Sequence, residues 1–403
     1  MEQEEAMNVS KTVRERAMAM PRVDTHCHFG LNFPDLDETA AKFDDFAVQR
    51  EMTSSRIHAI GCRELYGIDP GTFLRPDSPP EIFERARHFR ADGPVKALER
   101  AMDAAAITTQ ICFTGHFPER DELLPELAPL GDRVRVLAYV DDTVAGWDLA
   151  FTPDGYDPEF NYYDALSRHF GGLATFDEHL EALDATIDGW RGYGVIGMKT
   201  ALAYTLGLRF GDPSLAEART AFARKRDMTP EDVATVQHYA FRHALLACKR
   251  NEFPVVIHTG IVGTHVDLRQ TNPMQLQNIL ADSRYEDITF ILLHGGNPYA
   301  GEATYLAWAY PNVMIDFTWF SWMTQARFRM ALSEWIEVVP HGKLCWGSDS
   351  GTPETIVGIG HVVRSTVADV LEDLIARRVL DVPVALAFLE HLYDKNPRRI
   401  YQV

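Results

Sequence analysis

Imidazole, amine and carboxylate side chains stand at the ends of several short apolar runs in this chain of 403 residues. Neutral imidazoles and carboxylates together are the usual ligands of catalytic zinc and of similar divalent ions. A single histidine at such a position is more often structural, so the hypothesis of a metal site depends on how many of these groups lie close together in the fold. The candidate ligands are His26, His28, Lys199, His258, His294 and Asp349.

The runs that carry these residues have the pattern of buried strands. They are almost continuously apolar, which is typical of a parallel sheet covered on both faces. Helix signals separate them; the clearest is Thr229-Pro230-Glu231-Asp232, a capping residue followed by proline and acidic residues. The predicted strands lie at 22–29, 106–115, 133–142, 194–202, 253–260, 288–296, 312–319 and 342–351.

Strand and helix patterns therefore alternate eight times, which predicts an α/β protein with a closed (β/α)8 TIM-type barrel. We expect one domain over 1–403; a doubly wound sheet with two domains is the alternative. In a barrel, the C-terminal ends of all strands meet at one rim, where active sites lie. His26 and His28 point the same way because strand side chains alternate with period two. The six candidates, from five strands, would then form one metal site.

The spacing between the first two predicted strands is longer than a barrel needs. We interpret 31–105 as a largely helical insertion after the first strand. Its stretch 80–104 has the pattern of two short helices interrupted at Gly93-Pro94. Insertions that follow strands lie at the C-terminal face of a barrel, so this one is expected to wall the active site.

Composition excludes several classes of function. The net charge of −19 opposes binding to nucleic acid or to an anionic membrane, and no apolar stretch is long enough for a transmembrane helix. The five cysteines are widely spaced with no CxxC, and the first ten residues lack the pattern of a secretory signal. These features predict a cytoplasmic protein with free thiols; they say nothing positive about the substrate and leave open whether the protein forms a homo-oligomer.

The strand-end motifs resemble those of a known family. The matching segments are VDTHCHFG, GVIGMKTALAY, PVVIHTG, ILLHGGNPYAGEATYLAWAYPNVMIDFTW, KLCWGSDSGTPE and NPRRIY, which cover 22–30 and most of 190–403. Their order is similar to that of the amidohydrolase superfamily, in particular its amidohydrolase-2 branch and the amidohydrolase module of FluG-like proteins. The resemblance implies a divalent metal, with zinc expected first and manganese second, and water activated by that metal as the nucleophile.

The resemblance also implies roles for single residues. Asp349 would bind metal, accept the proton of the attacking water and deliver it to the leaving group. Lys199 would be carboxylated and bridge two ions, with His258 and His294 on the second. In relatives with one ion, the residue matching His294 is instead a catalytic acid or electrophile, so one or two ions per chain remain open.

The predicted function is metal-dependent hydrolysis of an amide, lactone or similar bond in a small organic molecule. A non-oxidative decarboxylase on the same scaffold is the first alternative. A catalytically silent barrel and, more weakly, a sugar-acid isomerase are the others. Three residues that follow predicted strands are candidates for contact with substrate: Tyr204, Arg269 and Trp319.

Overall fold

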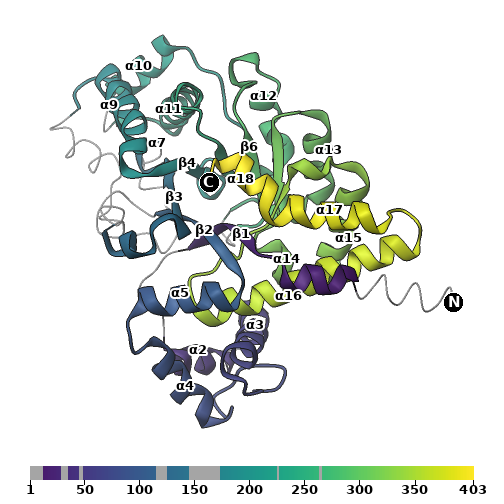
Figure 1. Cartoon of the computed structure of the whole chain (residues 1–403). Coiled ribbons are helices and arrows are strands. Elements are labelled where there is room, and N and C mark those ends of the chain that lie inside the picture. The colour runs from purple at the N-terminus through teal and green to yellow at the C-terminus, as the bar shows by residue number, and fades with distance from the viewer. Residues whose placement is uncertain are drawn as a thin grey trace.

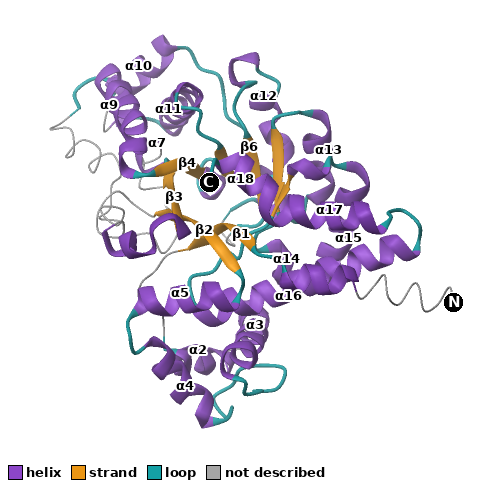
Figure 2. Cartoon of the chain, in the orientation of Figure 1, coloured by secondary structure: helices purple, strands orange, loops and turns teal. Residues whose placement is uncertain are grey.

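The computed structural model describes residues 12–28, 35–44, 49–114, 125–144, 173–224, 227–262 and 266–403. Its centre is one eight-stranded parallel sheet in which each strand pairs with the next along the chain, surrounded by helices (Figures 1 and 2). Each of the eight predicted strands is confirmed, and a two-domain doubly wound sheet is excluded by the strand order. The strands are β1 (Arg22–His28), β2 (Ile107–Thr114), β3 (Val134–Tyr139), β4 (Val195–Thr200), β5 (Val255–His258), β6 (Phe290–Leu293), β7 (Val313–Asp316) and β8 (Leu344–Cys345).

The last strand returns to the first through backbone hydrogen bonds. The Thr25 amide donates to the Trp346 carbonyl at 3.1 Å, and the Asp349 amide donates to the His26 carbonyl at 2.9 Å. Gly347 allows this approach, since a Cβ there would lie 2.6 Å from the His26 nitrogen. The residues after β8 are thereby held against β1, and the sheet is nearly closed.

The inside of the barrel is filled by one apolar layer and closed below by the C-terminal helix. Every strand except β4 contributes a buried side chain to this layer, β4 adds the partly buried Ile196, and α18 (Asn396–Tyr401) adds Ile400 and Tyr401. The Arg398 guanidinium reaches the Thr108 hydroxyl near the start of β2, which places α18 at the N-terminal end of the strands. The opposite rim is left open for a site. The strand residues of the layer are Val23, Ile111, Leu137, Val256, Ile291, Leu293, Met314 and Cys345.

The outer layer consists of amphipathic helices whose apolar faces pack on the strands. The predicted start of α11 (Pro230–Arg250) is confirmed: the Thr229 hydroxyl accepts from the Asp232 amide, and the Asp232 carboxylate bonds back to the Thr229 amide. Such a capping box satisfies donors that the first helical turn leaves free. The other principal helices are α9 (Phe176–Gly189), α10 (Leu215–Ala223), α13 (Ala300–Ala309), α15 (Gln325–Val338), α16 (Pro353–Ala376) and α17 (Val382–Glu390). Shorter helical turns include α7 (Asp141–Val144), α12 (Gln277–Leu280) and α14 (Phe320–Met323).

The segment after β1 is helical, as predicted, where it is described. It contains α2 (Leu36–Ala41), α3 (Gln49–Tyr66), α4 (Pro80–Arg90) and α5 (Pro94–Ala104). The break falls at Gly93, whose φ of 93° is in the left-handed region, followed by Pro94 as the first residue of α5. Helix α5 packs on β2 and α16 as part of the outer layer, and α3 packs along α16 (Figure 1). Residues 31–34 and 45–48 of the predicted insertion lie outside the described part.

Candidate metal centre

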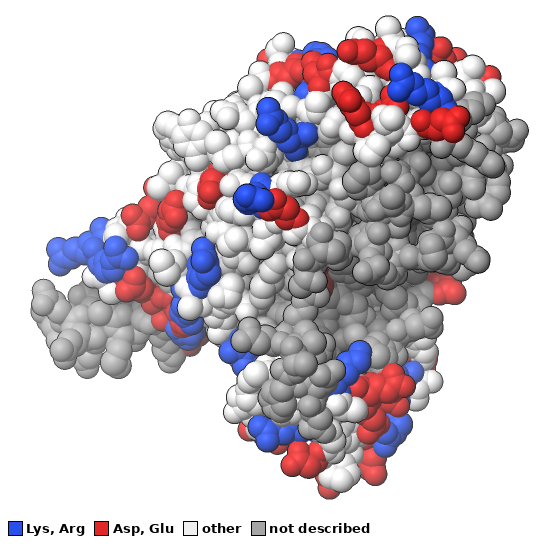
Figure 3. All heavy atoms as spheres, turned by 180° about the vertical axis from the view of Figure 1, so that it is seen from behind, with Lys and Arg blue, Asp and Glu red and all other residues white. Residues whose placement is uncertain are grey.

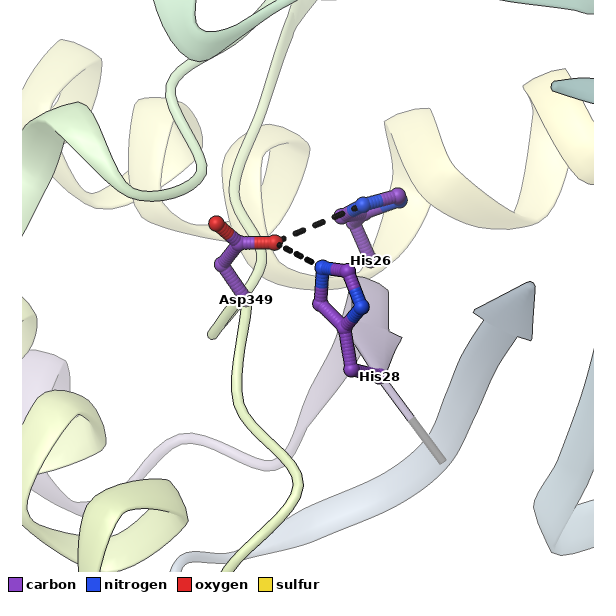
Figure 4. Close-up of side chains that lie close together, drawn as sticks. All are labelled: His26, His28 and Asp349. Carbon is purple, nitrogen blue, oxygen red and sulfur yellow. Dashed lines mark ion pairs between the residues drawn. The ribbon is translucent and has the colours of Figure 1, made fainter. Parts of the chain in front are cut away.

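The end of β1 and the segment after β8 bring three of the predicted ligands together. The Asp349 Oδ1 atom lies 2.9 Å from His28 Nε2 and 3.5 Å from His26 Nε2 (Figure 4). One ligand atom from each residue lies within 4.8 Å of the others. His26 is buried, Asp349 is partly buried with 11% of its side chain exposed, and His28 is half exposed to the cavity. The arrangement suits one divalent cation held by two imidazoles and a carboxylate.

A second pair of predicted ligands stands on β5 and just after β6. The Nε2 atom of His294 lies 3.0 Å from Nδ1 of His258. The remaining nitrogens face backbone carbonyl oxygens: His294 Nδ1 lies 3.1 Å from that of Thr318, and His258 Nε2 lies 2.6 Å from that of Ile261. A nitrogen that faces a carbonyl oxygen must donate, so we infer that both of these carry the proton. In neutral rings, the two facing nitrogens then both present lone pairs.

Burial keeps these imidazoles in their neutral form. Burial, together with nearby Lys199, lowers the pKa of His294 to about 4, although Asp349 opposes the shift. Burial also lowers the pKa of His258 and of His26 well below the usual value of histidine. The two facing lone pairs, on His258 Nδ1 and His294 Nε2, repel each other unless both nitrogens bind a cation. Neutral imidazoles whose other nitrogen donates to a carbonyl oxygen are the typical state of histidine metal ligands.

Asp349 remains ionised despite its position. Burial on its own would raise the pKa of this carboxyl group, but the adjacent His28, which lies within hydrogen-bond distance, outweighs burial, and the pKa is lowered. Its φ of 54° is in the left-handed region, as are the φ of 69° at His294 and 62° at Trp319. Non-glycine residues in this region cost backbone energy and often cluster at functional sites. All three of these residues line the same cavity.

Lys199 enters the cavity from β4. Its side chain is buried, and its Nζ has no hydrogen-bond partner among the described residues. Burial lowers the pKa of Lys199 to about 7, although Asp349, Asp141 and Asp316 oppose the shift. An unpartnered buried ammonium is costly, so the site favours the neutral amine or a modified form of it.

Two buried carboxylates that the sequence analysis missed hold the ligands in place. Asp24 accepts from Ser348, through its amide at 2.8 Å and its hydroxyl at 2.6 Å, and from Gln110 Nε2 at 2.9 Å. It thereby joins β1 to the residue before Asp349. Burial raises the pKa of Asp24 to about 6, although these hydrogen bonds oppose it.

The second carboxylate is Asp316, the last residue of β7. It accepts from the hydroxyl of Thr25 at 2.5 Å and from the amide and hydroxyl of Thr318 at 2.9 Å and 2.7 Å. The carbonyl of Thr318 is the oxygen that orients His294. A signal for Asp316 was present in the sequence, since it is a carboxylate directly after the apolar run Val313–Ile315, whereas Asp24 stands in a strand with several polar residues.

The cavity above these groups has a volume of about 360 Å³. Tyr204 lies against His258, with ring centroids 4.6 Å apart, and Trp319 lies edge-on to His294 at 5.4 Å. Both were predicted to contact substrate, and both line the cavity. The lining residues in the described part of the chain are His26, His28, Phe113, Tyr139, Lys199, Ala201, Tyr204, His258, His294, Trp319 and Asp349. Sequence analysis missed Phe113, Tyr139 and Ala201, which stand at or just after the ends of β2, β3 and β4.

The structure places the third substrate candidate elsewhere. Arg269 does not line the cavity; its side chain is 87% exposed and forms an ion pair with Asp267 at 2.6 Å. Asp267, two positions away, satisfies the guanidinium locally, so spacing after a strand does not imply orientation towards the site. None of the lining residues comes from 35–105 in the described part, so the prediction that this insertion walls the site stays a prediction.

Comparison with known families is consistent with this geometry. A family model described as Amidohydrolase matches residues 162–403, more than half of the chain. The chain belongs to the amidohydrolase family. A curated amidohydrolase relative is protein fluG of Emericella nidulans, 26% identical over 257 residues that cover 60% of this chain and 28% of fluG. The chain therefore spans less than a third of that relative's length.

Solved structures share the barrel of this amidohydrolase. A uronate isomerase of Thermotoga maritima superposes with a TM-score of 0.73 at 12% identity, covering 98% of this chain and 97% of the isomerase. A Lactobacillus casei protein described as a candidate metal-dependent hydrolase gives 0.71 at 18% identity, covering 97% of each chain. At such identities the likeness establishes the fold alone.

No helix in the described part of the chain is a candidate membrane span. Every described helix is too short or too polar to cross a lipid bilayer. On the face seen from behind, described basic and acidic side chains interleave and do not gather into a broad basic field (Figure 3). A small molecule that enters the cavity is the ligand that this family membership implies.

Proposed function

We propose that this chain is a metal-dependent hydrolase that cleaves an amide, lactone or similar bond in a small organic molecule. The observation that carries the proposal is the pair of lone-pair nitrogens, His258 Nδ1 and His294 Nε2, 3.0 Å apart in the cavity that also holds Asp349. Both nitrogens of this pair could bind one cation, and the pair lies in the same cavity as a separate set of three ligands. Two sets in one cavity support two ions per chain.

The donor atoms fit the implied metal. His26, His28 and Asp349 would hold one ion, and His258 and His294 the other. Imidazole and carboxylate suit zinc, our first choice, and manganese. A divalent ion bound there supplies a Lewis acid and lowers the pKa of water to about 7. If only one ion binds, His294 is left to act as a catalytic acid or electrophile.

Lys199 completes the proposed site in a carboxylated form that bridges the ions. A neutral amine is the nucleophile that carbon dioxide requires, and burial favours that form by lowering the pKa of Lys199 to about 7. Carboxylation replaces a cation that would repel a dication with an anion that attracts it. Lys199 lines the cavity, and its Nζ has no hydrogen-bond partner among the described residues that an added carboxylate would displace.

Asp349 is proposed as the proton carrier. As an ionised carboxylate facing the cavity, it can take a proton from the attacking water and pass it to the leaving group. Tyr204 and Trp319 supply apolar walls that would orient a planar or apolar part of the substrate. We place the enzyme in the cytoplasm, on the ground that its five buried cysteines are free thiols.

Hydrolysis and decarboxylation are separated by the origin of the product oxygen. The metal-loaded protein would be incubated in H₂¹⁸O with panels of small amides, lactones and carboxylic acids, and the products analysed by mass spectrometry. We expect one solvent oxygen in an acid product. Release of carbon dioxide without solvent oxygen in the organic product would establish the decarboxylase instead. Absence of turnover with fully loaded protein on all panels would favour a silent barrel.

A further inference from the structure

Two cysteines lie side by side directly behind the first set of ligands. Cys27 of β1 and Cys112 of β2 are register partners in neighbouring parallel strands. Both side chains are buried, at 1% and 0% exposure, in the apolar layer between the barrel and its helices. They point away from the cavity because Cys27 stands between His26 and His28, which face it.

The sulfur atoms are closer than two separate thiols prefer. The Sγ atoms lie 2.6 Å apart, whereas even the smaller carbon atoms settle at about 3.5–4.0 Å when not bonded. A disulfide bond measures about 2.04 Å and joins residues whose Cα atoms are about 4.4–6.8 Å apart. Neighbouring strands, spaced about 4.7–4.9 Å, fall within that range. The pair can therefore close without a change in strand pairing.

We propose that Cys27 and Cys112 form an oxidative modification site that a hydroperoxide converts to a disulfide. One thiol sulfur attacks the peroxide, giving a sulfenic acid and releasing water or an alcohol. The second thiol attacks that sulfur, so the S–S bond forms and a water molecule leaves. The two cysteines lose two electrons and two protons in total, and the hydroperoxide is reduced.

The position of the pair links this modification to the metal centre. Cys112 precedes Phe113, whose ring stacks on His26 at 5.2 Å between centroids and lies edge-on to His28 at 4.6 Å. A bond between the cysteines would link β1 to β2 covalently, immediately behind both imidazoles. The ligand geometry then depends on the oxidation state of the pair. None of the other cysteines, Cys62, Cys248 and Cys345, has a cysteine neighbour in the structure.

The test counts thiols before and after oxidation. The purified full chain would be treated with hydrogen peroxide, quenched, denatured, alkylated and analysed by intact mass and peptide mapping. We expect five alkylated cysteines without peroxide, and two fewer after it, with one peptide pair that links positions 27 and 112. A reductant should restore all five.

Matched variants distinguish this pair from general oxidation. Cys62→Ala removes a buried cysteine outside the pair and should still lose two thiols, whereas Cys112→Ala should lose none. Oxidation of Met330, which is 75% exposed, reports that the peroxide acted. Five alkylated cysteines in a wild-type sample whose Met330 is oxidised would overturn the proposal, as would a linkage between other positions. The wild-type map decides the matter even if Cys112→Ala fails to fold.

Discussion

Replacement of Asp349 by asparagine separates its two proposed roles. As a ligand, Asp349 contributes one oxygen and a charge; as a base, it must also accept a proton. Asparagine keeps the size and one acceptor oxygen but cannot take up that proton at neutral pH. It also tolerates the left-handed φ of 54° at this position, which a β-branched residue would not. The backbone conformation at position 349, which is held by the hydrogen bond to His26 and by the close approach at Gly347, should therefore be unchanged by the substitution.

The expected loss follows from general acid–base catalysis. Turnover should fall by about 10²–10⁴, which is about 2.7–5.4 kcal/mol in the activation free energy. Much of the metal should remain, because His26 and His28 still face the ion and the His258–His294 pair is untouched. The loss in kcat should thus exceed any loss in metal content.

Both quantities should be measured on the same preparation, as kcat and as metal ions per chain by elemental analysis. Asp287→Asn is a suitable control, since Asp287 is 70% exposed and pairs with Lys249 on the surface. Near-normal turnover in Asp349→Asn would remove this residue from the mechanism and leave it as a turn aspartate. Complete loss of metal would show that Asp349 is a ligand and would leave its role as a base unsupported.

Four further outcomes are expected. The purified protein should hold one or two divalent ions per chain, and strong chelation should abolish activity while circular dichroism still shows a folded barrel; full activity without metal would refute the hydrolase. Lys199→Ala should lose one ion and most activity, with partial rescue by short carboxylates, whereas wild-type metal content would show that Lys199 is not a ligand. His238→Gln and His243→Gln should retain all metal by elemental analysis, because both lie on α11 outside the cavity lining. Arg90→Met should destabilise the fold by about 3–5 kcal/mol in denaturant unfolding, because it leaves the fully buried Glu354 without the guanidinium that binds it at 2.6 Å; a change below about 1 kcal/mol would contradict this.

The sequence by itself determined the strands, their order and the six residues that enter the cavity. These features depend on local patterns: an apolar run predicts a buried strand, and a polar residue at its end predicts a rim position. The alternation of side chains along β1 was enough to place His26 and His28 together. The break at Gly93-Pro94 could also be predicted, because glycine adopts backbone angles that other residues avoid, and proline fixes its own φ and lacks an amide donor.

Only the tertiary structure decided how these residues face one another. The carbonyl oxygens of Thr318 and Ile261 select the ring nitrogens with which His294 and His258 confront each other. The buried support from Asp24 and the exposure of Arg269 likewise depend on contacts made or missed in space. Periodicity says which face a residue takes on its own element. Periodicity does not say which other group is packed against that face. That group is often more than a hundred residues away along the chain.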